Sequence, residues 1–227
     1  MKKLLFTFSI VFTGFFVQAQ TTTETRELNA FDQLEVSDAI EVELKKGDKT
    51  EIIITASGIA LNQVSAKIEK RKLVLEISGN NPKSSSVSAV LTYVQLNEIE
   101  AGSGARVIVK DVIENKTLSL KVSTNAYIEA EIISDKLILE AETNAKMFVK
   151  GTADNLDYNA FTNAEVEGEG LVVKNAEIRT NTNAFGSFEV LESLSGTAAT
   201  RGRVIYIGDP NKIDVKESIG GTIEQKK

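Results

Sequence analysis

The chain reads LSLKVSTNAYIEAEIISDKLILEAETNAKMFVKGTADNLDYNAFTNA from residue 118 to residue 164. The tripeptide Thr-Asn-Ala occurs three times in this stretch and once more beyond it, and its copies are 19, 19 and 20 residues apart. The four copies are Thr124-Asn125-Ala126, Thr143-Asn144-Ala145, Thr162-Asn163-Ala164 and Thr182-Asn183-Ala184, with degenerate copies at Ser103-Gly104-Ala105 and Thr200-Arg201-Gly202. The sequence is therefore a repeat with a period near 20 residues.

Within each repeat, apolar residues alternate with polar ones in constant phase with the tripeptide, which indicates β-strands. The phase is set by Leu118, Leu120 and Val122 in one repeat and by Leu137 and Leu139 in the next. A unit this short cannot bury its own apolar face, so the units must stack, one coil on another. Leucine-rich repeats need a helical half and propellers need about 40 residues per blade. We therefore predict an all-β fold, a parallel β-helix with coils of about 20 residues.

The asparagine of each tripeptide has a structural interpretation. Asn125, Asn144, Asn163 and Asn183 can turn the chain between two strands because Asn tolerates the left-handed conformation. Equivalent positions in adjacent coils lie about 4.8 Å apart, where side-chain amides can bond along the axis. We predict a structural ladder at the corners; Gly104 fits this pattern and Arg201 fits it less well. The alternative is that these amides bind a sugar or an ion.

The N-terminal part is less regular. Residues 40–44 and 51–55 resemble a hairpin, and so do residues 66–69 and 73–77. Residues 79–86 are the most loop-like stretch and suggest a boundary. We expect an N-terminal hairpin-rich region, residues 20–86, that caps the helix formed by residues 87–227. One continuous domain over residues 28–223 is the alternative.

Residues 1–19 have the pattern of a signal peptide. Two lysines precede an apolar stretch from Leu4 to Phe16, and Val17-Gln18-Ala19 matches a cleavage site. The stretch is shorter than the roughly 20 residues of a membrane span. No comparable run follows, so we expect no membrane span in the mature chain. The protein is expected to be exported and periplasmic, outer-membrane-associated or extracellular.

The composition excludes several kinds of chemistry. Among 227 residues there is no histidine, cysteine or tryptophan. The chain therefore has no Ser-His-Asp triad, thiol nucleophile, disulfide or His/Cys metal site. The formal net charge of −6 argues against nucleic acid, which requires a basic surface. We predict no cofactor, no metal, no catalytic residue set and no nucleic-acid partner.

The order of short motifs resembles that of a known family. The motifs are FDQLEVSDAIEVELKKGD (31–48), KLVLEISG (72–79), GSGARV (102–107), the serial TNA coils and RVIYIGDP (203–210). From about Leu28 to Ile223 the chain is similar to the bacterial head-GIN-domain family of autotransporter adhesins. The resemblance implies a right-handed single-stranded β-helix, an extracytoplasmic location and an adhesin-like role. The family's usual Gly-Ser-Gly coil starts are mostly Thr-Asn-Ala here.

The residues that alternate with the core positions should point outward and carry any function. Glu129 and Glu131, Lys150, and Glu167 alternate in sign between coils, which indicates ion pairs across strands. Four aromatic residues also occupy outward positions and would form a ligand-binding strip if they share a face. They are Tyr127, Phe148, Phe161 and Phe185. Candidate partners for such a strip are a glycan, an envelope protein or another copy of the chain, as an oligomer.

Two functions are consistent with this pattern. The first is an exported, non-enzymatic, adhesin-like binding or structural module of the bacterial envelope that presents a β-helix face to glycan or protein. The alternative is a carbohydrate-active enzyme, a polysaccharide lyase or hydrolase, that uses outward carboxylates such as Glu129, Glu167 and Asp157. A hydrolase requires two carboxylates about 5–9.5 Å apart beside a cleft. Geometry should therefore separate the two hypotheses.

Overall fold

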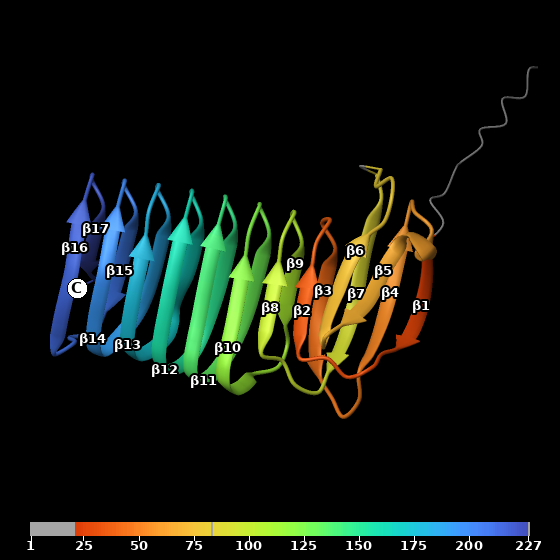
Figure 1. Ribbon diagram of the computed structural model, residues 1–227, viewed down its shortest axis with the longest axis horizontal. Coiled ribbons are helices and arrows are strands. Elements are labelled where there is room, and N and C mark those ends of the chain that lie inside the picture. Colours follow the sequence, from red (N-terminus) through yellow and green to blue (C-terminus); the bar gives the residue numbers. More distant parts are fainter. Residues whose placement is uncertain (1–20, 83, 227) are drawn as a thin grey trace, which may run out of the picture.

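The computed structural model describes residues 21–82 and 84–226 as an all-β protein (Figure 1). One short 3-10 turn, η1 (Leu61–Gln63), accompanies the strands. In these two ranges no helix is long and apolar enough to cross a membrane. The predicted signal peptide, residues 1–19, lies outside the described residues.

The C-terminal part of the chain forms the coils of a parallel β-solenoid, which has about seven turns in all. Leu118 pairs with Leu137 and Leu137 pairs with Leu156, so the repeat seen in the sequence is the register of the coils. The predicted parallel β-helix is confirmed. Its strands are β10 (Ile113–Val122), β11 (Tyr127–Glu142), β12 (Lys146–Phe161), β13 (Glu165–Thr180), β14 (Phe185–Ala199), β15 (Arg203–Ile207), β16 (Lys212–Ser218) and β17 (Thr222–Gln225).

The solenoid has two flat faces, because each long strand bends near its middle and contributes one half to each face. The N-terminal strands of the stack are β2 (Gln33–Val36), β3 (Glu41–Lys46), β6 (Lys72–Ile77), β7 (Ser86–Tyr93), β8 (Glu98–Ala101) and β9 (Arg106–Val109). We use the term front face for the surface formed by β6, β2, β8, β10, the second halves of β11–β14, and β16. The rear face comprises β7, β3, β9, the first halves of β11–β14, β15 and β17. In Figure 1 the front strands run upward and the chain returns downward behind them while advancing to the C-terminus, which is a right-handed winding.

Each corner between front and rear face contains two consecutive residues in the left-handed region. Thr124 and Asn125 have φ of 51° and 61°, and the other Thr-Asn-Ala copies have φ of 52–53° at Thr and 59° at Asn. The sequence analysis assigned this conformation to the asparagine alone, but the threonine adopts it as well, although β-branched residues rarely do. Backbone bonds between coils stabilise the corners: the Asn125 N–H donates to the Thr143 carbonyl at 3.1 Å, for example. Arg201, with a φ of 61°, occupies the equivalent place in a later coil.

The asparagine side chains at the corners also bond from coil to coil. Asn163 Nδ2 donates to Asn144 Oδ1, and Asn183 Nδ2 donates to Asn163 Oδ1, each at 3.1 Å. Among the described residues, Asn125 has no such side-chain bond. Three of the four asparagines are thus linked along the axis.

A second ladder, which sequence analysis missed, lies at the opposite edge, where the long strands bend. Asn155 Nδ2 donates to the Asp135 carbonyl at 3.3 Å, and Asn175 Nδ2 donates to Asn155 Oδ1 at 3.3 Å. Ser193 Oγ continues the series with a 2.7 Å bond to Asn175 Oδ1. The signal was present in the sequence, because Asn155 and Asn175 lie one repeat apart.

The core is a continuous column of inward side chains from successive coils. Leu118, Leu137 and Leu156 are at most 2% exposed, and Tyr158 packs edge-on against Phe188 with ring centroids 5.5 Å apart. Full burial of each large aliphatic side chain stabilises the fold by about 1.5–3 kcal/mol. This repeated burial explains how the fold can hold together without disulfides.

The N-terminal part confirms one predicted hairpin and corrects the other. β5 (Val64–Glu69) and β6 pair in antiparallel fashion around a turn at Lys70 and Arg71, as predicted. The hairpin predicted from residues 40–44 and 51–55 is wrong, because β7 lies between β3 and β4 (Glu51–Ser57). β7 pairs parallel with β3 and antiparallel with β4, and β1 (Thr21–Glu27) adds an outer antiparallel strand to β4. Strands from both sides of residues 79–86 therefore belong to one sheet.

Candidate binding face

Two rows of outward side chains cross the coils on the rear face. The rows are two residues apart along each strand. The register of β3, β9, β11, β12, β13, β14 and β15 defines both rows. The first row is Glu41, Arg106, Tyr127, Lys146, Glu165, Phe185 and Arg203. The second row is Glu43, Ile108, Glu129, Phe148, Glu167, Ser187 and Ile205, of which Ser187 is buried.

Three of the four aromatic residues expected to form a strip lie in these rows. Tyr127 and Phe185 belong to the first row, and Phe148 belongs to the second, in the coil after Tyr127. Phe161 ends β12 on the front face, where it pairs with Glu142. The structure therefore brings Tyr127 and Phe148 into neighbouring coils and separates Phe161 from them.

The ring of Tyr127 is held by two charged neighbours. The guanidinium carbon of Arg106 lies 4.0 Å from the ring centroid, a cation–π contact with one face of the ring. The Tyr127 hydroxyl donates to Glu129 Oε2 at 3.0 Å. Burial and the carboxylate of Glu129 raise the pKa of Tyr127, so the hydroxyl stays protonated at neutral pH. The ring is thus positioned before any ligand arrives.

Phe148 is the most exposed aromatic side chain of the rear face, with 38% of its surface accessible. The lysines beside Phe148 form ion pairs with carboxylates of neighbouring coils. Lys150 Nζ lies 2.8 Å from Glu131 Oε2, and Lys146 Nζ lies 2.6 Å from Glu165 Oε2. Phe148 is therefore an apolar patch framed by these two ion pairs and, directly across the strands, by Glu129 and Glu167.

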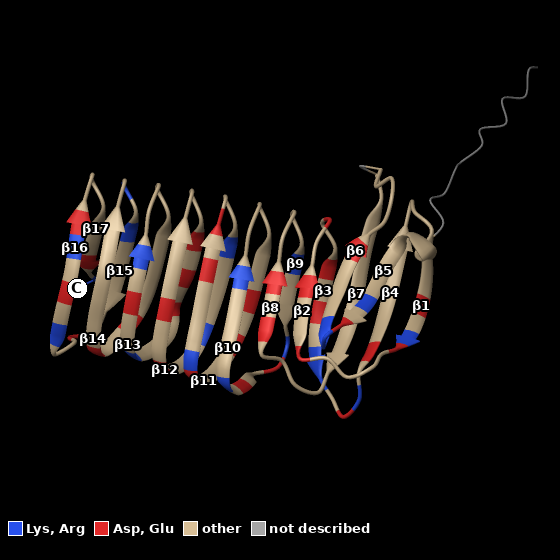
Figure 2. Cartoon of the chain, viewed as in Figure 1, with Lys and Arg blue, Asp and Glu red and all other residues tan. Residues whose placement is uncertain are grey.

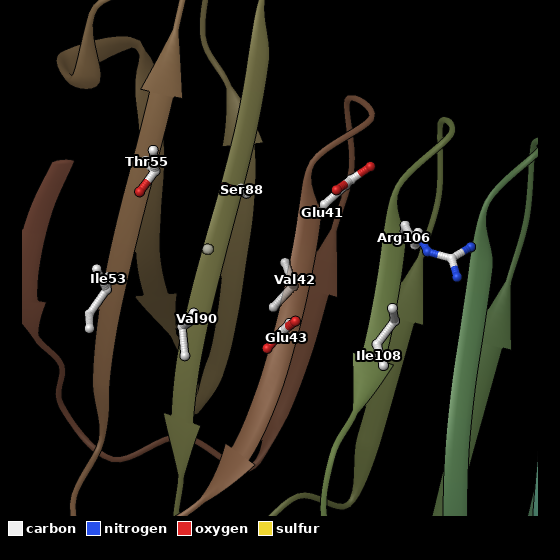
Figure 3. A pocket seen from close by; sticks show the side chains of 10 residues that line it. Glu41, Val42, Glu43, Ile53, Thr55, Ser88, Val90, Arg106 and Ile108 are labelled. Carbon is white, nitrogen blue, oxygen red and sulfur yellow. The ribbon is translucent and has the colours of Figure 1, made fainter. Parts of the chain in front are cut away.

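A shallow depression of about 270 Å³ adjoins the Arg106 end of these rows (Figure 3). It lies where the antiparallel strands β4 and β7 meet the parallel strands β3 and β9, and Ile53, Val90 and Ile108 give it an apolar lining. Glu41 and Glu43 flank it. Pockets for drug-sized ligands typically have 300–1,000 Å³. This depression can therefore hold little more than one sugar ring or one side chain.

The comparisons with known proteins agree with the fold. Residues 30–210 match the family model described as "Putative auto-transporter adhesin, head GIN domain".

The chain belongs to the head GIN domain family.

Solved structures of proteins described as "putative adhesin" have the same fold as this head GIN domain. The one from Bacteroides fragilis aligns with a TM-score of 0.77 and 16% identity, over 91% of this chain and 97% of that chain. The one from Parabacteroides distasonis gives 0.71 and 15%, over 92% and 98%. The one from Parabacteroides merdae gives 0.67 and 18%, over 92% and 97%. No match was found among the curated proteins.

The carboxylates considered for an enzyme do not form one cluster in this head GIN domain. Glu129 and Glu167 flank Phe148 on the rear face, two coils apart. Asp157 lies on the front face, where it pairs with Glu177 and accepts a 2.8 Å bond from Asn159. The three carboxylates considered for a polysaccharide lyase or hydrolase are therefore distributed over both faces.

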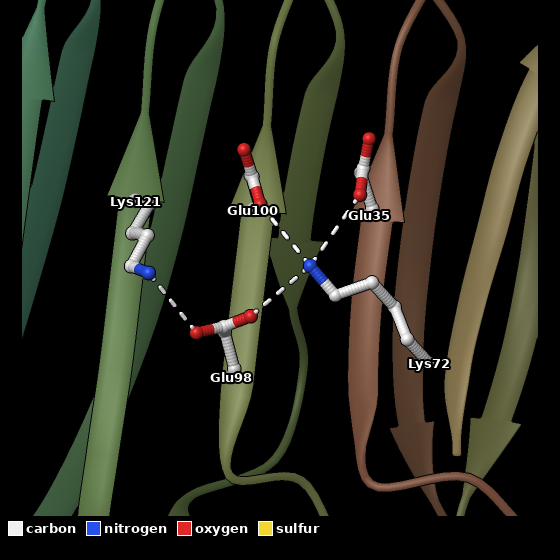
Figure 4. A network of polar contacts seen from close by, with 5 residues as sticks. All are labelled: Glu35, Lys72, Glu98, Glu100 and Lys121. Atoms are coloured by element: carbon white, nitrogen blue, oxygen red, sulfur yellow. Dashed lines mark hydrogen bonds and ion pairs between the residues drawn. The ribbon is translucent and has the colours of Figure 1, made fainter. Parts of the chain in front are cut away.

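A cluster of three carboxylates of the head GIN domain surrounds a lysine on the front face (Figure 4). Lys72 Nζ lies 3.4 Å from Glu35, 3.3 Å from Glu98 and 3.4 Å from Glu100, and Lys121 Nζ lies 3.1 Å from Glu98. Burial alone would lower the pKa of Lys72, but the bond to Glu98 and the charge of Glu100 raise it. Within the described residues, no group of three or more acidic side chains is arranged to hold a metal. The cluster therefore ties the four strands β6, β2, β8 and β10 together.

Sequence reasoning missed the depression at β4, β7, β3 and β9. It arises because β7 enters between two strands that were predicted to form a hairpin. The alternation in residues 86–93 could have signalled an extra strand, although not its partners. The head GIN domain thus has a candidate site that depends on pairing between distant segments.

Proposed function

We propose that the protein is an exported binding module of the bacterial envelope whose rear face binds glycan. The observation that carries this proposal is the Tyr127 ring, fixed by Arg106 and Glu129, with the exposed Phe148 in the next coil. Aromatic side chains supply a large contact area with few rotatable bonds, so little entropy is lost when a ligand binds them. The C–H face of a sugar can pack on such a ring while nearby charged groups bind its hydroxyls.

The geometry of the face favours an extended ligand over a small molecule. Outward positions repeat at strand spacing, about 4.8 Å, across the coils. The depression beside Arg106 is small, and Phe148 and Phe185 continue the apolar contacts two coils apart. A polymer chain or a partner surface can contact several of these positions at once.

The family description supports export of the protein, and so does the signal-peptide pattern in residues 1–19. Cleavage after Ala19 would leave Gln20 as the first residue of the mature chain. N-terminal sequencing of the protein recovered from the producing bacterium, after separate fractionation of periplasm, outer membrane and medium, tests both cleavage and compartment. Retention of Met1 in every fraction would contradict export by this route.

A glycan array probed with the purified protein tests the proposed ligand class, and a parallel assay for released reducing ends tests for turnover. We expect binding to a subset of glycans without new reducing ends. Release of reducing ends would support the carbohydrate-active enzyme instead. Absence of glycan binding together with binding to a purified envelope protein would assign the rear face to a protein partner.

A further inference from the structure

The two ends of the solenoid are finished differently. At the N-terminal end, β1 and β5 lie outside the first coils, and the apolar side chains of β4 beneath them, Ile52 and Ile54, are fully buried. Arg26 of β1 donates to the carbonyls of Val64 at 3.0 Å and Leu61 at 3.2 Å, which ties the outer strands together. This end has a built cap.

At the C-terminal end, the last coil is formed by β16 and β17. Among the described strands, β16 pairs only with β14 and β17 only with β15, so the outer edge of each is unpaired. Ile213 stands one coil beyond Leu194 in the same inward row, yet it is 49% exposed whereas Leu194 is fully buried. Val215 and Ile223 are likewise only partly buried. No described residue therefore covers the core at this end.

The polar residues at inward positions of the same coil are already bonded within the chain. Glu217 Oε1 accepts a bond from the Ile223 N–H at 2.6 Å. Gln225 Nε2 donates to the Gly208 carbonyl at 2.7 Å. Ile213, Val215 and Ile223 remain as an apolar group between two free strand edges. Unpaired edges of this kind are templates for pairing with another chain.

We propose that this C-terminal end docks against the same end of a second copy of the protein. The two copies are related by a two-fold axis that runs perpendicular to the front and rear faces. Rotation about this axis keeps each face on its own side and reverses the strands. β16 then pairs antiparallel with β16 of the second copy, β17 pairs with β17, and the two cores join.

The charges along β16 and the length of the strand together select one register for this pairing. Its outward side chains Lys212, Asp214 and Lys216 alternate in sign, as the bands on β16 in Figure 2 show. Val215 is the midpoint of β16, so placing it on the axis pairs all seven residues of the strand and sets Asp214 opposite Lys216 of the second copy, twice. An axis at Asp214 would place that residue opposite itself and Lys212 opposite Lys216. Opposite charges stabilise a cross-strand pair and like charges destabilise it.

Such a dimer would also affect glycan binding, and this consequence rests on the proposed function. Because the axis is perpendicular to the faces, both rear faces point the same way. Two Tyr127–Phe148 sites would then meet one surface together, and a second binding event becomes intramolecular. Dimerisation itself uses a different surface, so it can fail or hold independently of glycan binding.

Sedimentation velocity of the purified protein at about 1–100 μM, the range that resolves micromolar dissociation constants, tests the proposal. We expect a monomer–dimer equilibrium with no larger species. Asp214→Lys should raise the dimer dissociation constant at least about tenfold, because it sets lysines opposite each other. Asp214→Lys/Lys216→Asp should restore it. Glu140→Lys, the same charge change on the front face of a central coil, should leave it unchanged.

Circular dichroism verifies that each variant is folded, and Val215→Lys replaces Asp214→Lys if the latter is not. A native protein that stays monomeric over the whole range overturns the proposal. So does a dimer that Asp214→Lys weakens no more than Glu140→Lys, or one that the double variant fails to restore. Species that keep growing with concentration would indicate head-to-tail stacking and also overturn the two-fold arrangement.

Discussion

The hydroxyl of Tyr158 donates a 2.8 Å hydrogen bond to the backbone carbonyl of Phe185. Tyr158 belongs to the front-face half of β12 and Phe185 begins β14 on the rear face, so this bond crosses the core and ties the two faces together. Glycine at position 186 makes room for it, because a Cβ there would lie 2.5 Å from the Tyr158 oxygen. Burial raises the pKa of Tyr158, which keeps the hydroxyl protonated as a donor.

Tyr158→Phe should destabilise the protein, because it removes the donor and leaves a buried carbonyl with one partner fewer. We expect a loss of about 1 kcal/mol, which corresponds to a fall in Tm of about 2–4 °C in a chain of this size. Urea denaturation and calorimetry measure the two values. Tyr127→Phe is the control, since its hydroxyl bonds at a half-exposed site, and it should cost less. Equal losses would show that the bond across the core contributes no more than one at a half-exposed site.

The corner ladder predicts a graded response at Asn163, which both donates and accepts a side-chain bond. Asn163→Ala loses both bonds and places a less tolerant residue at a φ of 59°, so we expect a cost of about 1–2 kcal/mol. Asn163→Gly should recover the part of this stability loss that comes from the backbone conformation. Asn125→Ala, in a corner with the same backbone but without the ladder bond, isolates the amide contribution in urea denaturation. If the two alanine variants lose the same stability, the amide ladder is not stabilising.

Stability should fall in alkali because of Tyr93. Burial, together with the charge of Asp111, raises the pKa of Tyr93 to about 12, and its hydroxyl has no hydrogen-bond partner among the described residues. The unfolded chain loses this proton near pH 10 and the folded chain only near pH 12, so stability is full below pH 10 and decreases up to pH 12, by at most about 1.4 kcal/mol per pH unit. Tyr93→Phe should flatten the decline of unfolding free energy between these values. An unchanged slope would refute this assignment.

Lys72→Met should lower the free energy of unfolding, because it leaves Glu35 and Glu100 on the front face without the cation they share. These groups are partly exposed, so we expect a cost of only about 1–2 kcal/mol at pH 7. Burial alone would raise the pKa of Glu98, but Lys121 and Lys72 hold it below its ordinary value. The stability this contributes is present above the unfolded pKa of about 4.5 and is lost as the pH falls through the lower folded value.

The variant should therefore lose less stability on acidification than the native protein, as urea denaturation from pH 7 to pH 3 would show. Lys110→Met, which removes a single pair with Glu43 at 3.4 Å, is the matched control. A parallel decline in all three proteins would contradict this role of the cluster.

The repeat made most of the fold predictable. Leu118, Leu137 and Leu156 hold one phase in the sequence and one column in the structure, because stacking of identical units leaves a single register that buries them all. The pairing of β3 and β4 was predicted wrongly for the opposite reason. The alternation in residues 51–57 suits any neighbouring strand, and nothing local specifies that β7, some thirty residues later, pairs with it.

The candidate site was predictable only in part. Outward direction followed from alternation, but Phe161 was grouped with Phe148 although it precedes a corner and Phe148 follows one. Each Thr-Asn-Ala corner moves the chain from the front to the rear face, so position relative to the corner decides the face. The Arg106–Tyr127 contact depends on rotamers and on pairing between β9 and β11, which a sequence pattern does not specify.

The central claim is that ligand binding belongs to the rear face, and a comparison of two phenylalanines tests it most directly. Equilibrium binding of a ligand found on the glycan array should be measured for the native protein, Phe148→Ala and Phe161→Ala. Both changes remove the same side chain from β12, Phe148 near the start of the strand on the rear face and Phe161 at its end on the front face. We predict that Phe148→Ala weakens binding about tenfold, equivalent to about 1.4 kcal/mol, while Phe161→Ala leaves it unchanged. Equal weakening by both, or weakening by Phe161→Ala alone, would contradict the account.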